Sequence, residues 1–330
     1  MGVFPLKTFM TSRGGPFNCS YCFEPILKKM YRGLGKYERK HSVDRVIAEI
    51  LDLKKKWPVE FIKFEDDLFV LAKHDPWLEE FTERYPREVG IPFNALVRVD
   101  SINEDMARLL KQAGCVSLNI CIDSANQEIR KLVVRKRFTN EQIIENFQIL
   151  KRYKINIFNN MILGLPPLEI ATSELIIQFD KDAIDLEIAA GVHFSSRSIL
   201  MPYPGTEIGK WCEEKGYFKM DVDKFGESIS ERSPLRCFTD EQKDVMKNIL
   251  YLSGLAVWQS RLAPFIKNHA IYWRSRFAKI MFLAIYFLVK VYTLKKYIYP
   301  IKISPIRGLK DLIKGFWIEA KRTAEKSLKV

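Results

Sequence analysis

Between residues 6 and 215 the chain alternates short apolar runs with longer segments in which apolar side chains recur at helical spacing. The short runs predict six β-strands, at residues 6–12, 60–66, 92–98, 116–122, 155–163 and 193–200. Strands that alternate with helices in this way form parallel βα units. The pattern therefore predicts an α/β fold whose core is a partial (βα)6 barrel of the TIM type.

Capping residues indicate where the intervening helices begin and end. Ser42 is expected to be the N-cap of one helix, with Asp44 in its first turn, where an acid suits the helix dipole. Asn103 is expected to begin a second helix that ends at Gly114, and a third begins at Thr139. These signals place helices between the predicted strands, as a barrel requires.

The pattern changes after Gly226, where helical segments continue without clear strands. We therefore predict two regions. The first is a partial barrel over residues 1–215, and the second is a helical, basic region over residues 216–330.

The most apolar stretch of the chain, residues 277–294, lies in the second region. Its uninterrupted part spans only 280–289, and a membrane-spanning helix needs about 20 residues. Lys279 and Lys290 bracket this part, which is typical of an amphipathic helix lying in a membrane interface. A buried helix whose lysines extend to solvent is the alternative.

The formal net charge of +13 belongs to the end of the chain. Residues 257–330 contain sixteen Lys and Arg against three acidic residues, so the first 256 residues are neutral overall. This charge predicts an anionic membrane surface as a partner of 257–330. Nucleic acid is not predicted, because no nucleic-acid-binding motif accompanies the charges. The N-terminus lacks the apolar core of a secretory signal, which predicts a cytoplasmic protein, peripheral on the inner membrane face.

Two cysteines three residues apart, Cys19 and Cys22, follow the first predicted strand. In a parallel barrel the reacting groups sit at the carboxyl ends of the strands, so these cysteines lie where a site is expected. Such a pair can belong to a zinc site, a redox dithiol or an iron–sulfur site. Zinc would need two more close ligands, and no second Cys-x-x-Cys or Cys-x-x-His is present. A thioredoxin-type dithiol usually opens a helix in a much smaller fold.

The surrounding sequence, SRGGPFNCSYC at 12–22, resembles the signature of radical S-adenosylmethionine (radical SAM) enzymes. In that family three cysteines spaced Cys-x-x-x-Cys-x-x-Cys hold a 4Fe-4S cluster, and here Gly15 stands at the first position. The likeness is closest to the branch that often carries a cobalamin-binding domain. It implies a cluster held by Cys19 and Cys22, S-adenosylmethionine as cofactor, and a reductant protein as partner. The implied activity is formation of a 5′-deoxyadenosyl radical for methylation or rearrangement of a substrate, which the motifs do not identify and which we expect to be lipid-like.

The resemblance also implies roles for residues at the other strand ends, although it identifies no catalytic residue. Tyr21 matches the aromatic residue beside the adenine, and Asp66 and Asp67 match the acids near the methionyl amino group. In NICIDSANQ, Asp123 and the adjoining Ser124 match the segment that binds the ribose. Gly164, in NMILGLPP, matches the turn on which the adenine packs.

Two departures from the family pattern bear on activity. Gly15 replaces a cluster cysteine, and the first strand begins too near residue 1 for a preceding cobalamin domain, so any cobalamin is expected from another domain or chain. Cys121 lies two residues before Asp123 and should point the same way along the strand, so it is a hypothetical third thiolate; a small buried hydrophobe is the alternative. An alternative interpretation is that the protein is a catalytically degenerate relative of these enzymes. It would then act as a binding or regulatory partner at the membrane surface.

Overall fold

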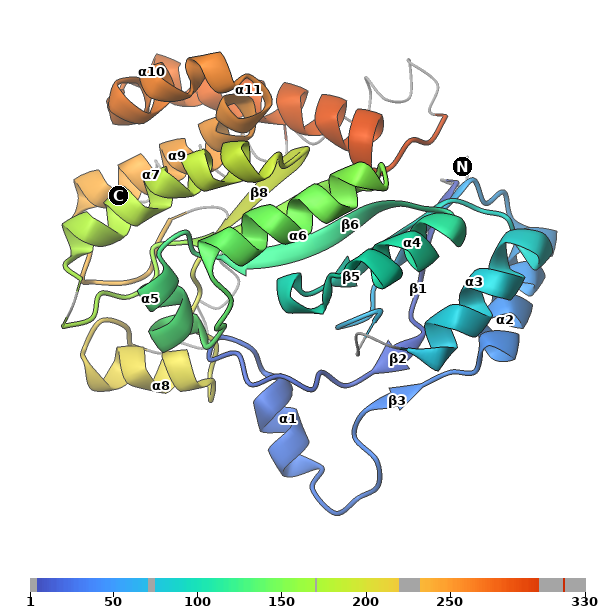
Figure 1. The fold of residues 1–330 in the computed structure, drawn as a ribbon. Helices are drawn as coiled ribbons and strands as arrows, with labels where there is room; N and C mark the ends of the chain where they lie inside the picture. Colours follow the sequence, from blue (N-terminus) through green and yellow to red (C-terminus); the bar gives the residue numbers. More distant parts are fainter. Residues whose placement is uncertain (1–4, 71–74, 170, 220–231, 303–316, 318–330) are drawn as a thin grey trace.

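A curled parallel sheet forms the centre of the computed structural model, which describes residues 5–70, 75–169, 171–219, 232–302 and 317 (Figure 1). The sheet contains six strands in the order β1-β4-β5-β6-β7-β8, and every neighbouring pair is parallel. The strands are β1 (Leu6–Phe9), β4 (Phe61–Phe64), β5 (Phe93–Val97), β6 (Cys115–Asp123), β7 (Asn156–Leu163) and β8 (Phe194–Ile199). Each predicted strand is present in its predicted place, so the partial barrel is confirmed.

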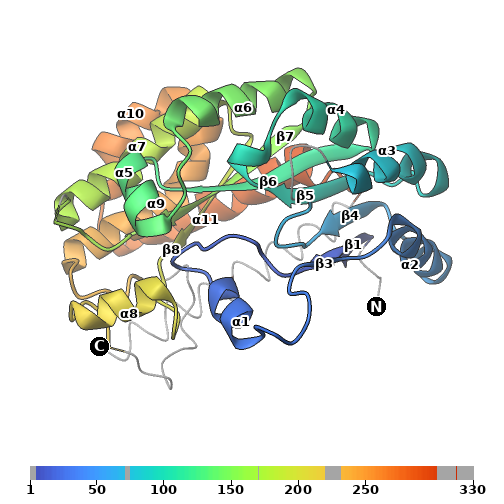
Figure 2. The ribbon, with the colours of Figure 1, turned by 60° about the horizontal axis from the view of Figure 1, so that its bottom comes forward.

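Helices connect the strands and cover the outer face of the sheet, as Figure 2 shows for α2 to α4 and for α6 and α7. They are α2 (Val43–Lys56), α3 (Pro76–Glu88), α4 (Glu104–Gln112), α6 (Asn140–Arg152) and α7 (Ser173–Ala190). The predicted caps are confirmed, because the side chains of Ser42, Asn103 and Thr139 each accept a backbone hydrogen bond at a helix start. Gly114 follows α4 with φ +98°, a conformation that favours glycine.

Shorter elements occupy the connections at the carboxyl ends of the strands. Strands β2 (Ser12–Arg13) and β3 (Arg39–Lys40) pair antiparallel on either side of helix α1 (Glu24–Met30). After β6 come α5 (Gln127–Ile129) and the π-helical turn η2 (Arg130–Val134), and after β8 comes α8 (Glu207–Glu214). A 3-10 turn, η1 (Val99–Ser101), follows β5.

The C-terminal helices pack against the sheet. They are α9 (Asp240–Trp258), η4 (Ser260–Leu262), α10 (Ala263–Asn268), η5 (Ala270–Tyr272), α11 (Arg276–Thr293) and η6 (Leu294–Ile298). Ser117 Oγ, near the start of β6, donates to the Ile298 carbonyl at 2.9 Å, and Asn156 Nδ2, at the start of β7, donates to the Tyr297 carbonyl at 2.6 Å. Segment η6 therefore lies at the amino ends of the strands, opposite the end where a barrel places its chemistry.

One continuous hydrophobic core runs from α2 through the sheet to α11. The regional boundary at residue 215 remains a prediction. Most of the basic tail beyond residue 302 lies outside the described residues.

Helix α11 contains nearly all of the predicted apolar segment 277–294 and has two different sides. Its buried residues are Ala278, Phe282, Leu283, Val289 and Thr293. The other side exposes Phe277, Ile280 and Leu288, whose exposed fractions are 76%, 61% and 58%. One side of the helix is therefore buried, as the alternative interpretation expects, and binding of the exposed side to a membrane interface remains a prediction.

Among the described residues, Arg276–Ile298 is the one helix whose length and composition would allow it to cross a membrane. Only 28% of its apolar window is buried in the protein. This is weak evidence for a span, because core helices of soluble proteins meet the same criterion.

We expect Thr139→Ala to lower the free energy of unfolding by about 1 kcal/mol. Thr139 Oγ1 accepts from the Gln142 amide at 3.2 Å while Gln142 Oε1 accepts from the Thr139 amide at 2.9 Å, so the change removes half of a reciprocal cap of α6. Urea unfolding followed by circular dichroism measures the effect. The control is Glu145→Ala at an exposed position of the same helix, and equal midpoints for the two variants would contradict the prediction.

Candidate functional site

The loop after β2 carries both predicted cluster cysteines. The Cys22 amide donates to the Cys19 carbonyl at 3.1 Å, which closes a tight turn, and both side chains are partly buried. Gly14, before the turn, has φ +88°, and a Cβ there would lie 2.7 Å from the Tyr37 carbonyl. Only glycine fits that position, so the backbone path of the loop depends on it.

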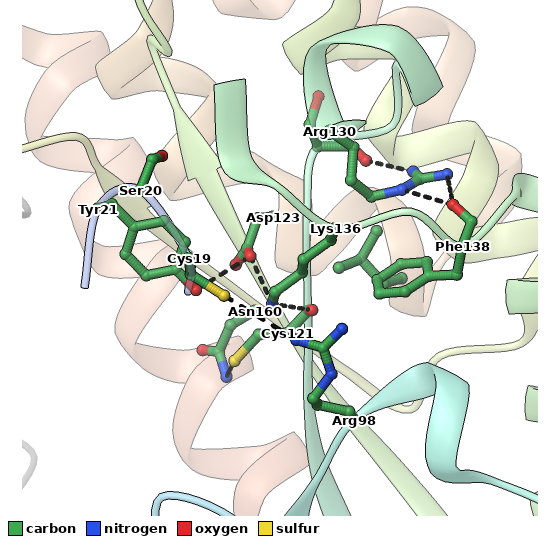
Figure 3. Close-up of polar contacts among 12 residues, drawn as sticks. Cys19, Ser20, Tyr21, Arg98, Cys121, Asp123, Arg130, Lys136, Phe138 and Asn160 are labelled. Carbon is green, nitrogen blue, oxygen red and sulfur yellow. Dashed lines mark hydrogen bonds and ion pairs between the residues drawn. The ribbon is translucent and has the colours of Figure 1, made fainter. Parts of the chain in front are cut away.

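The buried side chains of Asp123 and Lys136 form a polar cluster with the partly buried Tyr21 of this loop (Figure 3). Lys136 Nζ lies 2.6 Å from Asp123 Oδ2 and donates to the Cys121 carbonyl at 2.7 Å. The Tyr21 hydroxyl donates to the same Asp123 oxygen at 3.1 Å. Burial opposes the charged form of Lys136, but the neighbouring groups, Asp123 foremost among them, together outweigh it, so the pKa of Lys136 is raised. Burial and the Asp123 charge raise the pKa of Tyr21, so its hydroxyl stays a hydrogen-bond donor.

The backbone at Asp123 is adapted to present this carboxylate. Asp123 ends β6 with φ +70°, an uncommon conformation for a residue other than glycine, and the pairing with β7 shifts register between Cys121 and Asp123. Strained residues of this kind gather at functional sites. Asp123 is 2% exposed, and in this buried position its carboxylate is paired with Lys136.

Arg130 fixes the turn that brings Lys136 back to Asp123. Its guanidinium is fully buried and donates to the Ser124 carbonyl at 2.7 Å and to the Phe138 carbonyl at 2.8 and 3.1 Å (Figure 3). The predicted residue Ser124 therefore contributes its backbone carbonyl to the structure of this turn.

Arg98, at the end of β5, lies beside Cys19. Its Nη1 is 3.9 Å from Cys19 Sγ, and its guanidinium carbon sits 3.6 Å from the centre of the Phe17 ring. Nη2 pairs with Asp100 at 2.7 Å. The guanidinium thus places a positive charge next to Cys19.

Cys121 lies in the same cluster, with its Sγ 3.8 Å from Asn160 Nδ2 (Figure 3). Burial raises the pKa of its thiol to about 11, while Lys136 acts in the opposite direction. The thiol is therefore protonated at neutral pH. Its proposed role as a third cluster ligand remains a hypothesis.

The three acids after β4 have different environments. Asp66 is 2% exposed, and its Oδ1 accepts from the Thr11 amide at 2.8 Å and from the Ser12 hydroxyl at 2.5 Å. Its Oδ2 is buried without a hydrogen-bond partner among the described residues, and burial raises the Asp66 pKa. Asp67 is exposed, yet partial burial and the charges of Glu24 and Asp66 raise its pKa. Glu65 pairs with Lys63 and takes no part in the cluster.

Gly164 ends β7 with φ +65°, and its amide donates to Asp180 Oδ2 at 3.0 Å. A Cβ at Gly164 would lie 2.8 Å from the sulfur of Met246 on α9. The turn therefore needs glycine for its conformation and for close contact with α9.

The structure thus brings Cys19, Tyr21 and Asp123 together, and it places Cys22 and Asp67 in a second group around the cluster loop. Sequence reasoning missed Lys136 and Arg98 as site residues. Arg98 ends a predicted strand, which is a positional signal, whereas nothing local distinguishes Lys136 from its basic neighbours. Their roles, like those of the predicted residues, remain predictions.

Two further observations concern metal binding and the space around the site. Within the described residues, no three His, Cys, Asp or Glu side chains converge closely enough to hold a single metal ion. A hollow of about 450 Å³ lies between the turn after β7 and α8 with the residues that follow it, lined among others by Pro167, Trp211 and Tyr217.

Comparison with known sequences matches residues 9–179 to the family model described as the radical SAM superfamily. An uncharacterized methyltransferase of Pyrococcus horikoshii is 30% identical over 251 residues, which cover 76% of this chain and 51% of that protein. The cytidylyl-2-hydroxyethylphosphonate methyltransferase of Streptomyces wedmorensis is 24% identical over 212 residues, which cover 63% of this chain and 37% of that protein. The chain therefore spans about half, or less, of the length of these curated relatives.

Among solved structures, the radical S-adenosylmethionine methyltransferase TsrM from Kitasatospora setae, with cobalamin and a 4Fe-4S cluster bound, has a similar fold. Its TM-score is 0.53 at 20% sequence identity, over 72% of this chain and 42% of that chain. The same enzyme with tryptophan and a SAM analogue bound gives a TM-score of 0.54 at 21% identity, over 71% of this chain and 44% of that chain. At these identities the likeness concerns the fold.

We expect Asp180→Asn to change how stability depends on pH. Burial raises the pKa of Asp180 to about 8, against about 3.9 for an unfolded chain. Between these values the folded state holds a proton that the unfolded state has lost, so this group's contribution to the free energy of unfolding falls as pH rises from about 4 to about 8. The variant should therefore gain stability relative to wild type over that range.

Urea midpoints at pH 5 and pH 8 measure this effect, because asparagine can still accept the Gly164 hydrogen bond without titrating. Asp185→Asn, at an exposed position of α7, is the matched control. Identical pH dependence in wild type and Asp180→Asn would show that Asp180 does not titrate in this way.

Proposed function

Because the chain belongs to the radical SAM superfamily, we propose that it is an iron–sulfur enzyme of the methyltransferase type, which methylates or rearranges its substrate. Enzymes of this superfamily use a 4Fe-4S cluster and S-adenosylmethionine. The observation that supports activity best is the buried cluster of Tyr21, Asp123 and Lys136 beside Cys19. A chain that had lost its chemistry would have little need to keep a strained, charged residue buried at this position.

The residues present fit the cofactor in their chemistry. Cys19 and Cys22 offer two thiols on one loop, which suits iron. Asp66 Oδ2 is a buried acceptor without a partner among the described residues, and it suits a cationic donor such as the amino group of S-adenosylmethionine. When bound, the cluster and S-adenosylmethionine supply the electron and the 5′-deoxyadenosyl radical that begin the reaction.

The chain's own residues would bind and orient that cofactor. Both contacts to Asp123 fall on Oδ2, and Oδ1 takes part in neither, so Oδ1 is the oxygen proposed to accept from a ribose hydroxyl. Lys136 holds the carboxylate in place, and Tyr21 carries the ring proposed to lie beside the adenine. The Gly164 turn, closed by Met246 and Phe238, would exclude water from the other side of the adenine.

We propose that cobalamin, where the reaction uses it, is supplied by another domain or chain. The TsrM structure contains cobalamin, and this chain covers 42% of that enzyme. The described residues correspond to the partial barrel and its C-terminal helices.

We expect the protein, reconstituted anaerobically with iron and sulfide and reduced with dithionite, to convert S-adenosylmethionine to 5′-deoxyadenosine. The measurement is chromatography of the quenched reaction. A Cys19→Ala/Cys22→Ala double variant is the control, and it should form none because it lacks both thiols. If wild type with a verified cluster forms no 5′-deoxyadenosine, the chain is a degenerate relative that binds or regulates, and the proposed activity is wrong.

We further propose that the exposed side of α11 binds an anionic membrane surface. Phe277, Ile280 and Leu288 form an apolar stripe on this helix, and Tyr272 and Trp273, which are 46% and 43% exposed, precede it. Exposed basic side chains stand at both ends of the stripe: Arg276, Lys295 and Lys296. Apolar side chains flanked by lysines and arginines match the boundary between acyl chains and anionic headgroups, where each basic residue contributes about 1 kcal/mol.

An enzyme held at that surface would meet a lipid-like substrate, which is the substrate class we propose. Its location would then be the cytoplasmic face of the membrane. The remaining basic residues of the tail, beyond residue 302, lie outside the described residues and are not needed for this proposal.

We expect wild type to float with vesicles that contain anionic lipid, and Phe277→Asp/Ile280→Asp to lose most of that binding. The double change places charge in the apolar stripe without touching the buried side of α11. Leu34→Asp, at an apolar position that is 77% exposed in another loop, should bind as wild type does. Wild type that stays in the soluble fraction with anionic and neutral vesicles alike would rule out this attachment.

A further inference from the structure

Gly15 stands where the cluster-binding signature has its first cysteine, and nothing in its backbone requires glycine. The neighbouring Gly14 has φ +88°, whereas Gly15 is not among the residues with positive φ. A side chain at residue 15 would therefore be compatible with the loop. The question is what occupies the space into which that side chain would extend.

The space is filled by a single carboxylate side chain, that of Glu24. The three heavy atoms nearest a Cβ built at Gly15 are all from this residue: Cγ at 3.3 Å, Oε2 at 3.5 Å and Cβ at 3.7 Å. The carboxylate thus lies beside the position that a cysteine sulfur at residue 15 would take. Glu24 is only 9% exposed, which is unusual for a glutamate unless its charge has a function or a partner.

Two hydrogen bonds hold the carboxylate in this position. Glu24 Oε2 accepts from the Gly15 amide at 2.6 Å and from the Tyr37 hydroxyl at 2.7 Å. Both bonds fall on the same oxygen, and Oε1 takes part in neither. The side chain is anchored by one oxygen and presents the other.

Glu24 also adjoins the second cysteine of the pair. Its amide donates to Cys22 Sγ at 3.4 Å, and the Glu24 charge is among those that affect the Cys22 thiol. The turn from Cys19 to Cys22 brings the other thiol to the same loop. Two thiols and one carboxylate are therefore gathered around the loop that would carry three thiols.

We propose that Glu24 is the third protein ligand of the iron–sulfur cluster and takes the place of the cysteine that Gly15 replaces. This inference rests on the proposed function, because it assumes that a cluster binds. A carboxylate carries the same negative charge as a thiolate and is a common ligand of iron in proteins. The protein ligands of a cluster bind different irons, so they need not converge on one point as they would around a single ion.

The proposal competes with the hypothesis that Cys121 supplies the missing ligand. The Cys121 thiol contacts Asn160 and lies against the Lys136 and Asp123 pair, and none of its atoms is among the nearest neighbours of a side chain at residue 15. Glu24 occupies the space beside residue 15, whereas Cys121 lies beside Asn160.

The test is anaerobic reconstitution with iron and sulfide of wild type, Glu24→Gln, Cys121→Ala, and the double variant Glu24→Gln/Gly15→Cys. Glutamine keeps the size of the side chain and can still accept from Gly15 and Tyr37, so the loop should keep its shape. Tyr37→Phe is the matched control, because it removes one hydrogen bond to Glu24 and leaves the carboxylate. Circular dichroism and thermal unfolding establish that each variant is folded.

We expect Glu24→Gln to release iron to a chelator at least about 10-fold faster than wild type does. The electron paramagnetic resonance spectrum of its reduced cluster should also differ from that of wild type. Adding Gly15→Cys should restore retention, since it returns a thiolate to the original position after a small movement of residue 24. Cys121→Ala should retain iron as wild type does, and Tyr37→Phe, which keeps the carboxylate, should retain it better than Glu24→Gln.

The outcomes separate this proposal from the proposed function. Equal iron retention and equal spectra in wild type and Glu24→Gln would overturn the Glu24 assignment and leave the activity standing. Loss of retention in Cys121→Ala in place of Glu24→Gln would overturn it in favour of the thiol. A wild-type protein that takes up no cluster, beside a Glu24→Gln/Gly15→Cys variant that does, would also overturn it. A stable cluster that yields no 5′-deoxyadenosine would instead refute the activity.

Discussion

The ion pair between Lys136 and Asp123 is the interaction on which the geometry of the site depends. Both side chains are almost fully buried, and losing one partner of such a pair typically costs about 3–5 kcal/mol because the other charge is left without compensation. The pair joins the end of β6 to the connection after η2, and through the Tyr21 hydroxyl it also reaches the cluster loop. Three segments distant in sequence are thereby held at one point. The Arg130 guanidinium makes this possible, because it satisfies the carbonyls of the turn that returns Lys136 to the strand.

The two ends of the strands are held together by different kinds of interaction. At the amino ends of the strands, η6 closes the sheet through backbone carbonyls that accept from Ser117 and Asn156. At the carboxyl ends, the charged side chains of Lys136, Asp123 and Arg130 connect β6 with the turn that follows it. Neutral hydrogen bonds at one end and buried charges at the other correspond to the usual division of a parallel barrel into a stabilising end and a chemical end.

All six strands and the caps at Ser42, Asn103 and Thr139 could be predicted from the sequence, because apolar periodicity and capping are local properties of the chain. The candidate residues at strand ends could be found for a related reason, since parallel topology brings those ends together. Lys136 could not be identified as a site residue from the sequence, because its contact with Asp123 depends on a buried turn that brings the two side chains together. The amphipathic character of α11 shows the same limit, since only the packing against α9 decides which of its apolar side chains are buried.

Gly14 and Gly15 show how two adjacent glycines can contribute to one loop in different ways. Gly14 is constrained by conformation, because its positive φ and the nearby Tyr37 carbonyl leave no room for a side chain. Gly15 has an ordinary backbone, and its missing side chain leaves space that the Glu24 carboxylate fills. Tyr37 contributes to both, since its carbonyl restricts Gly14 and its hydroxyl holds Glu24. The loop therefore keeps its shape without a cysteine at position 15, because the Glu24 side chain fills the space beside Gly15 and accepts a hydrogen bond from its amide.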